Sequence, residues 1–285
     1  MADPLILVTG GTGHLGRDLV ARLLARGRRV RVFARLPGTD ARVQWARGDL
    51  GNGDGLRDAL SGVDTVIHAA TFSPVAQRGF IRLIDLVRAP HSVDIEGTQR
   101  LLDECGRAGV RHLLYVSIVG LEADTSFPYN RVKFAAETLV RESLLPWSIV
   151  RAEPFHYLLA RLFASMRAWP WWILPDAPTQ PVDTSDVAAY LADCAEDDRR
   201  GMRDEIGGPE VKTLPELARE YLLARHLDRR VLPWKVSDTR AKRMGFAPAQ
   251  GLRGTVSWHD WLATHDDEPK GRVRDQPLPA APFNA

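Results

Sequence analysis

The chain has 285 residues, of which 45% are hydrophobic and 26% are charged, the ordinary balance of a globular protein. Its 38 Lys and Arg residues against 36 Asp and Glu give a formal net charge of +2, which supplies no global field for nucleic acid. The two cysteines, Cys105 and Cys194, argue against a disulfide framework or a cysteine-based zinc site. No apolar run approaches the ~18 residues of a membrane span, and no signal peptide is visible, so we expect a soluble, cytoplasmic protein without a membrane partner.

Short apolar runs alternate with amphipathic helical patterns through the first half of the chain. The runs lie at residues 5–8, 30–33, 63–70 and 110–116. Strands that alternate with helices predict βαβ units and a parallel sheet, and right-handed crossovers wind helices over both faces. The expected fold class is therefore α/β, with a doubly wound parallel (Rossmann) sheet.

The second half continues this alternation less cleanly. A strand is expected at 147–150, helices at 185–194, 213–226 and 258–264, and a short strand at 231–236, and Thr213 with Glu216 forms the capping box of the second helix. The polar, Pro-rich end of the chain is either a frayed tail or an arm that packs on a partner. We predict a dinucleotide-binding core over 1–152 with a lid-like insertion at 72–92, a smaller C-terminal substrate lobe over 153–265, and a tail over 266–285.

A glycine loop separates the first predicted strand from the first predicted helix. Gly10, Gly13 and Gly16 have the spacing that allows a sharp turn, a close backbone approach to a pyrophosphate, and close helix–sheet packing. The phosphates of a ligand would meet free N–H groups and the positive end of the helix dipole. The strand–loop–helix context favours a dinucleotide site over a tight turn without a ligand.

The loop resembles that of the short-chain dehydrogenase/reductase superfamily, in its extended and atypical branches. Further stretches resemble family motifs in the family's order, namely Gly48-Asp49-Leu50, His68-Ala69-Ala70, Tyr115 to Gly120, and Tyr129 to Lys133. Later, 151–156 and 181–188 look like the NmrA-like, azoreductase-like subgroup. The resemblance spans roughly residues 4–265.

This resemblance implies a bound nicotinamide dinucleotide and no metal. Asp49 and Leu50 would contact the adenine, and Ala69 and Ala70 would lie against the cofactor. The implied contacts are Gly10, Thr12, Gly13, His14, Leu15, Gly16, Arg35, Asp49, Leu50, Ala69, Ala70, Lys133, Pro154 and Phe155.

The end of the second strand decides the expected cofactor. It carries Arg35, with Arg31 nearby, where NAD-preferring members have a carboxylate. An arginine there can pair with a 2′-phosphate, so we expect NADP(H). The alternative is that these arginines are solvated surface charges.

The predicted catalytic group is Tyr129 with Lys133 and Ser117. Tyr129 and Lys133 are four residues apart and share one face of a helix, where the ammonium would lower the pKa of the phenol. Ser117 would hydrogen-bond the carbonyl oxygen of the substrate. Tyr129 follows Ser117 by only 12 positions, a shorter connection than extended members have. Ser117, His156, water or a substrate hydroxyl therefore stay open as proton donors, and so does a purely structural His156.

Two aromatic stretches are candidates for the substrate pocket. One is the amphipathic insertion that begins at Phe72, which would form a lid. The other holds Trp169, Trp171 and Trp172, which could stack on a flat substrate. The competing interpretations of these tryptophans are core between lobe and sheet, or a dimer or interfacial surface.

These observations predict an NADPH-dependent reductase for a carbonyl of a bulky aromatic small molecule, such as a ketoreductase in polyketide or antibiotic biosynthesis. The alternatives are a quinone or azo reductase, a non-catalytic NADP-sensing regulator of the NmrA type, and a sugar-nucleotide epimerase or dehydratase. The Tyr129/Lys133 pair argues against the sensor, and the missing acidic residue argues against the epimerase. A monomer and a homodimer both stay open.

Overall fold

The computed structural model describes residues 3–71, 92–121, 128–266 and 278–279 of the chain. Its centre is a sheet of nine strands in the order β13-β10-β6-β5-β4-β1-β2-β3, with β9 paired beside β6. Every pairing in this sheet is parallel. The strands are β1 Leu5–Thr9, β2 Arg29–Ala34, β3 Gln44–Arg47, β4 Thr65–His68, β5 His112–Ile118, β6 Trp147–Ala152, β9 Gly201–Met202, β10 Ile206–Gly207 and β13 Leu252–Arg253.

The central strands are covered on both faces, which explains their continuous apolar runs. All five residues of β1 and all four of β4 are buried. β1 lies between β2 and β4. The sheet continues with β2 and β3 on one side of β1 and with β4, β5 and β6 on its other side, as in a doubly wound sheet. The predicted doubly wound α/β fold is confirmed.

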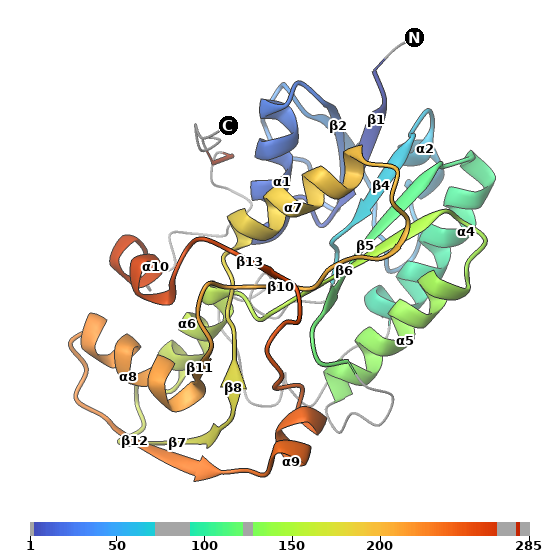
Figure 1. Ribbon diagram of the computed structural model, residues 1–285. Helices are drawn as coiled ribbons and strands as arrows, with labels where there is room; N and C mark the ends of the chain where they lie inside the picture. Colours follow the sequence, from blue (N-terminus) through green and yellow to red (C-terminus); the bar gives the residue numbers. More distant parts are fainter. Residues whose placement is uncertain (1–2, 72–91, 122–127, 267–277, 280–285) are drawn as a thin grey trace.

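Helices form a layer on each face of this sheet (Figure 1). The apolar sides of α1 (His14–Ala25) and α7 (Thr184–Glu196) pack in one core cluster with β1, β2 and β6. The opposite cluster takes in α2 (Leu56–Leu60), α4 (Thr98–Ala108) and α5 (Pro128–Glu142). A short π-helix, η2 (Ser92–Gly97), leads into α4.

The later elements build a second, smaller packing unit below the sheet in Figure 1. Two parallel strands, β7 and β12, form its ribbon, and β8 pairs with β11. Its core holds Phe163, Trp172, Tyr221 and Trp258. The elements are α6 His156–Ser165, β7 Trp171–Asp176, β8 Pro178–Thr179, β11 Lys212–Thr213, α8 Leu214–Ala224, β12 Arg230–Lys235, α9 Asp238–Arg243 and α10 Trp258–Thr264.

The start of α8 and the position of Trp172 test two sequence expectations about this lobe. The capping box of Thr213 and Glu216 is present at the start of α8. The expectation that Trp172 faces substrate is wrong, because its ring is fully buried in the lobe core and its Nε1–H donates to the Met166 carbonyl at 3.0 Å. Strand alternation explains this, since Trp172 points inward while its neighbours in β7 point outward.

Parts of the predicted domain division lie outside the described residues, including most of the lid-like insertion at 72–92 and most of the tail at 266–285. Leu278 of the tail packs against the core cluster beneath α1 and α7. The boundary after residue 152 stays a prediction, and β9, β10 and β13 return from beyond it to extend the main sheet.

Candidate functional site

The glycine loop is closed so tightly that side chains cannot enter it. Gly10 has a φ of +76°, and a Cβ there would lie 2.7 Å from the Ala70 nitrogen. A Cβ on Gly16 would lie 2.1 Å from the Gly10 carbonyl oxygen. Gly13, the residue before α1, caps the helix without a side-chain hydrogen bond, and no acidic residue follows in the first turn. The amides at this helix start are therefore available to an anionic ligand, as a dinucleotide phosphate requires.

A buried histidine holds the end of β4 against the glycine loop. His68 Nδ1 accepts a hydrogen bond from Thr9 Oγ1 at 2.7 Å, and its Nε2–H donates to Thr98 Oγ1 at 2.9 Å. Burial, and then the charge of Lys133, lower the pKa of His68 to about 3, so the ring is neutral. Ala69 and Ala70 follow directly and lie beside the glycine loop, where contacts to a cofactor are expected.

The structure also contains a turn at Asp49 and Leu50, the residues that are predicted to contact the adenine. Asp49 accepts a hydrogen bond from the Gly51 amide on Oδ1 at 2.9 Å, and its own amide donates to the Asp54 carbonyl. Leu50 is buried against the sheet and approaches Gly97. The turn thus presents a fixed backbone at the edge of the sheet, beyond β3.

The two arginines of strand two have different surroundings. Arg31 donates to the carbonyls of Ala59 and Ser61 and to the side chain of Gln44, so it is part of the fold. Arg35 follows β2, is exposed, and has no hydrogen bond or ion pair to any described residue. The nearest carboxylate along the chain, Asp40, is paired with Arg42 at 2.7 Å. A free guanidinium therefore stands where the 2′ position of an adenine ribose is expected.

Tyr129 lies in the first turn of α5, within reach of a short hydrogen-bonded series. Its hydroxyl shares a hydrogen bond with Thr71, and Thr71 donates to Asp94 Oδ1 at 2.5 Å. Burial raises the pKa of Tyr129, and the charge of Lys133 opposes this rise without cancelling it. Lys133 thus acts in the predicted direction, but desolvation of the phenolate outweighs its attraction.

Lys133 is buried one turn further along α5. Its Nζ donates to the Val116 carbonyl at 3.1 Å and lies 4.6 Å from the centre of the Tyr115 ring. This contact with β5 fixes the ammonium behind Tyr129, where it favours the phenolate that remains after a proton is given up.

Ser117 does not face Tyr129. Its hydroxyl is buried and donates to Glu137 Oε2 at 2.7 Å. Glu137 also pairs with Arg151, with Oε1 and Nη2 2.7 Å apart. The structure therefore places Ser117 in a polar contact among β5, α5 and β6, and its role toward a substrate carbonyl stays a prediction that this geometry does not favour.

His156 has structural surroundings as well. It is buried in the lobe, its Nε2–H donates to the Val256 carbonyl at 3.0 Å, and its ring lies 5.5 Å from that of Trp258. Burial lowers its pKa. These contacts favour the structural interpretation over a proton donor or substrate contact.

An aromatic wall that the sequence did not predict joins the loop to α6. The rings of His14 and Tyr157 stack with centroids 3.9 Å apart, and Phe155 follows at 5.7 Å from Tyr157. The Tyr129 hydroxyl is among the groups that raise the pKa of Tyr157, so the two tyrosines are neighbours. Burial lowers the pKa of His14 to about 4, which leaves its ring neutral. The available sequence signal for Tyr157 was its position two residues after Phe155, a predicted cofactor contact.

The remaining predicted site residues differ in their exposure. Thr12 is half-buried in the glycine loop and Leu15 is buried at the start of α1, while Pro154 is exposed after β6. Trp169 lies exposed on the outside of the lobe. Phe72 lies outside the described residues.

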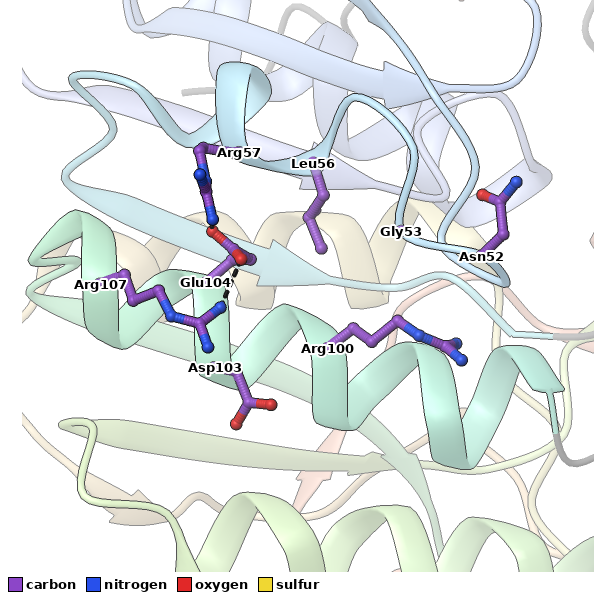
Figure 2. A pocket seen from close by; sticks show the side chains of 8 residues that line it. All are labelled: Asn52, Gly53, Leu56, Arg57, Arg100, Asp103, Glu104 and Arg107. Atoms are coloured by element: carbon purple, nitrogen blue, oxygen red, sulfur yellow. Dashed lines mark hydrogen bonds and ion pairs between the residues drawn. The ribbon is translucent and has the colours of Figure 1, made fainter.

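A surface hollow of about 440 Å³ between α2 and α4 contains none of these residues (Figure 2). Arg57 and Arg107 both reach Glu104, and Arg100 binds Glu96 and the Gly51 carbonyl. Its cations are already neutralised, so we place no ligand there.

In the part of the chain that the structure describes, no three His, Cys, Asp or Glu side chains gather as potential metal ligands. No helix there is long and apolar enough to cross a membrane.

Comparison with known proteins identifies the family and the fold. A family model described as NAD(P)H-binding matches residues 10–198, more than half of the chain. The (4-alkanoyl-5-oxo-2,5-dihydrofuran-3-yl)methyl phosphate reductase of Streptomyces griseus is 31% identical over 229 residues, 74% of this chain and 71% of the relative. The sterol demethylase protein B of Methylococcus capsulatus is 41% identical over 119 residues, 40% of this chain. The chain spans about a third of the length of that relative, since the match covers 34% of it.

A solved structure shows the same fold. A short-chain dehydrogenase/reductase superfamily protein of Agrobacterium tumefaciens, crystallised with bound NAD, has a TM-score of 0.67. It is 22% identical, over 91% of this chain and 95% of that one. The chain therefore belongs to the NAD(P)H-binding family whose model it matches, and it shares its fold with a short-chain dehydrogenase/reductase, the family that its motifs resemble.

Proposed function

We propose that the protein is an NADPH-dependent oxidoreductase, a ketoreductase that reduces a carbonyl of a bulky, polycyclic small molecule. The observation that carries this proposal is the position of Tyr129. It lies beside the buried ammonium of Lys133 and next to the aromatic wall that begins in the glycine loop. A proton donor, a cation and a dinucleotide-type loop thus meet at one end of the sheet.

The protonation state of Tyr129 suits a reduction. A phenol ordinarily keeps its proton at neutral pH, and burial raises the pKa of Tyr129 further, so the proton is present for a developing alkoxide. Lys133 then stabilises the phenolate, and Thr71 and Asp94 offer a hydrogen-bonded route for a replacement proton. NADPH, when bound, supplies the hydride.

The choice of substrate class rests on the aromatic surface near Tyr129 and on two relatives. The rings of His14, Phe155 and Tyr157 replace Trp169 and Trp172 as the aromatic surface near Tyr129. One relative is named as a phosphate ester reductase and another as a sterol demethylase protein, so small and polycyclic substrates both occur among similar proteins. We favour a fused-ring ketone or quinone of the kind met in polyketide and antibiotic biosynthesis.

The test is NADPH oxidation with a panel of fused-ring ketones and quinones, wild type beside Tyr129→Phe. We expect the variant to lose about a hundredfold in kcat/KM, because phenylalanine keeps the ring and removes the proton. Binding of NADPH, followed by its fluorescence, serves as the control and should stay within about twofold. Full turnover by the variant would remove Tyr129 as the donor. NADPH binding without reduction of any carbonyl would instead favour an NADP-sensing regulator.

A further inference from the structure

The outer face of the ribbon formed by β7 and β12 is apolar. In β7, Trp171 and Ile173 are 60% and 66% exposed, whereas the alternate residues Trp172 and Leu174 are buried. The register places Ile173 beside Leu232 of β12. The tryptophan face, as we name it, comprises Trp169, Trp171, Ile173, Leu232 and Trp234.

Such a face is unusual for a ribbon with one buried side, since the side in contact with water is ordinarily polar. Here the inner side packs on the lobe core and the outer side is still built from large apolar residues. Contiguous exposed apolar surface marks an interaction site more often than isolated apolar residues do. In Figure 1 the ribbon lies at the bottom of the molecule, at the opposite end from the N-terminus and β1.

Positive charge surrounds this face. Residues 167–176 and 228–243 contain seven Lys and Arg against three Asp, a net charge of +4, although the whole chain carries only +2. Arg230 is paired in register with Trp171 and is exposed, and its guanidinium makes no hydrogen bond or ion pair with a described residue. The Arg240 guanidinium lies 4.6 Å from the centre of the Trp234 ring.

We propose that the tryptophan face docks the protein on the surface of an anionic lipid bilayer. Indole rings favour the interfacial layer of a bilayer, where their apolar body and their N–H are both accommodated. Lysine and arginine beside them are attracted to anionic headgroups. The ribbon would lie in the interface without crossing it, which is compatible with the absence of a membrane-spanning helix among the described residues.

A second copy of the chain is a poorer occupant of this face. A symmetric dimer would place the same surface on both sides of the contact, so Arg230 and its neighbouring cations would face their own copies. Like charges brought together in this way oppose the association, whereas an anionic bilayer compensates them.

The test is flotation of the full-length protein with vesicles of phosphatidylcholine alone or of phosphatidylcholine mixed with phosphatidylglycerol. We expect wild type to float with the mixed vesicles and not with the neutral ones, and to be released by salt. Trp171→Ser and Arg230→Glu should each weaken binding by about tenfold or more. Leu144→Ser, on an exposed loop between α5 and β6, is the matched control and should bind as wild type does. Thermal unfolding of each variant verifies that the fold is kept.

Two results would overturn the proposal. One is equal flotation of Trp171→Ser, Arg230→Glu and wild type, or no flotation of any of them. The other is a dimer in sedimentation analysis that Trp171→Ser dissociates, together with no vesicle binding, which would assign the face to contact between copies.

Discussion

Two arginines at the strand β2, one within it and one directly after it, have different surroundings and different expected roles. Arg31 is held by backbone carbonyls and Gln44, so its removal would disturb the fold. Arg35, directly after β2, is exposed beside the predicted cofactor site and makes no hydrogen bond or ion pair with a described residue. A free arginine in this place is positioned to meet a 2′-phosphate, which NADPH has and NADH lacks.

The first prediction follows at this scale. We expect Arg35→Ala to lower kcat/KM for NADPH by about tenfold or more, because a charge-assisted contact to phosphate is lost. The value for NADH should change by about twofold or less. Arg29→Ala is the matched control, since Arg29 starts the same strand, is exposed and donates only to the Asp3 carbonyl. If both cofactors lose activity equally in Arg35→Ala, this residue does not select the cofactor.

At the scale of elements, β7 assigns opposite roles to adjacent tryptophans. Trp172 fills the lobe core against Phe163 and Tyr221, whereas Trp171 lies on the outer face. The period of two along a strand separates them, and the partner strand β12 confirms which side is inside. From the sequence alone, the three tryptophans of this stretch had the same possible roles, namely a substrate pocket, the core between lobe and sheet, or a dimer or interfacial surface.

The second prediction compares these neighbours by denaturant unfolding. Trp172→Ala should lower the free energy of unfolding by about 3 to 5 kcal/mol, because it leaves a cavity in a packed core. Trp171→Ala should change it by about 0.5 kcal/mol or less, as expected for a surface residue. An unchanged stability of Trp172→Ala with a raised KM would restore the pocket interpretation of this residue.

At the scale of the whole molecule, the buried polar groups make stability depend on pH. His68 connects β1, β4 and α4 and is neutral, with its pKa lowered to about 3 by burial. In the unfolded chain its pKa returns to about 6.5. Between these values the unfolded state binds more protons than the folded state, so the free energy of unfolding falls as pH falls below about 6.5.

The third prediction measures this dependence. Within that window, His68 should contribute a slope of up to about 1.4 kcal/mol per pH unit. His68→Gln should lower stability at neutral pH and should also show a shallower pH dependence than wild type. His259→Gln, at an exposed position of α10, is the control and should keep the slope of wild type. Equal slopes in wild type and His68→Gln would mean that His68 does not hold its neutral form.

The sequence by itself determined the features that neighbouring residues encode. The glycine loop, the apolar runs and the capping box of Thr213 depend on spacing along the chain, so the α/β fold and the dinucleotide site could be predicted from them. The arginine at the end of the second strand could be read in the same way.

Only the tertiary structure decided which side chains meet. It turned the Ser117 hydroxyl to Glu137, brought Tyr157 to His14 and Tyr129, and buried Trp172 while exposing Trp171. Each of these outcomes depends on packing between segments far apart in the chain, and local periodicity carries no information about such contacts. The glycine loop and its helix were therefore predictable, because they lie within one strand–loop–helix unit. The surroundings of Tyr129 were not, because they are assembled from segments at β4, α5 and α6.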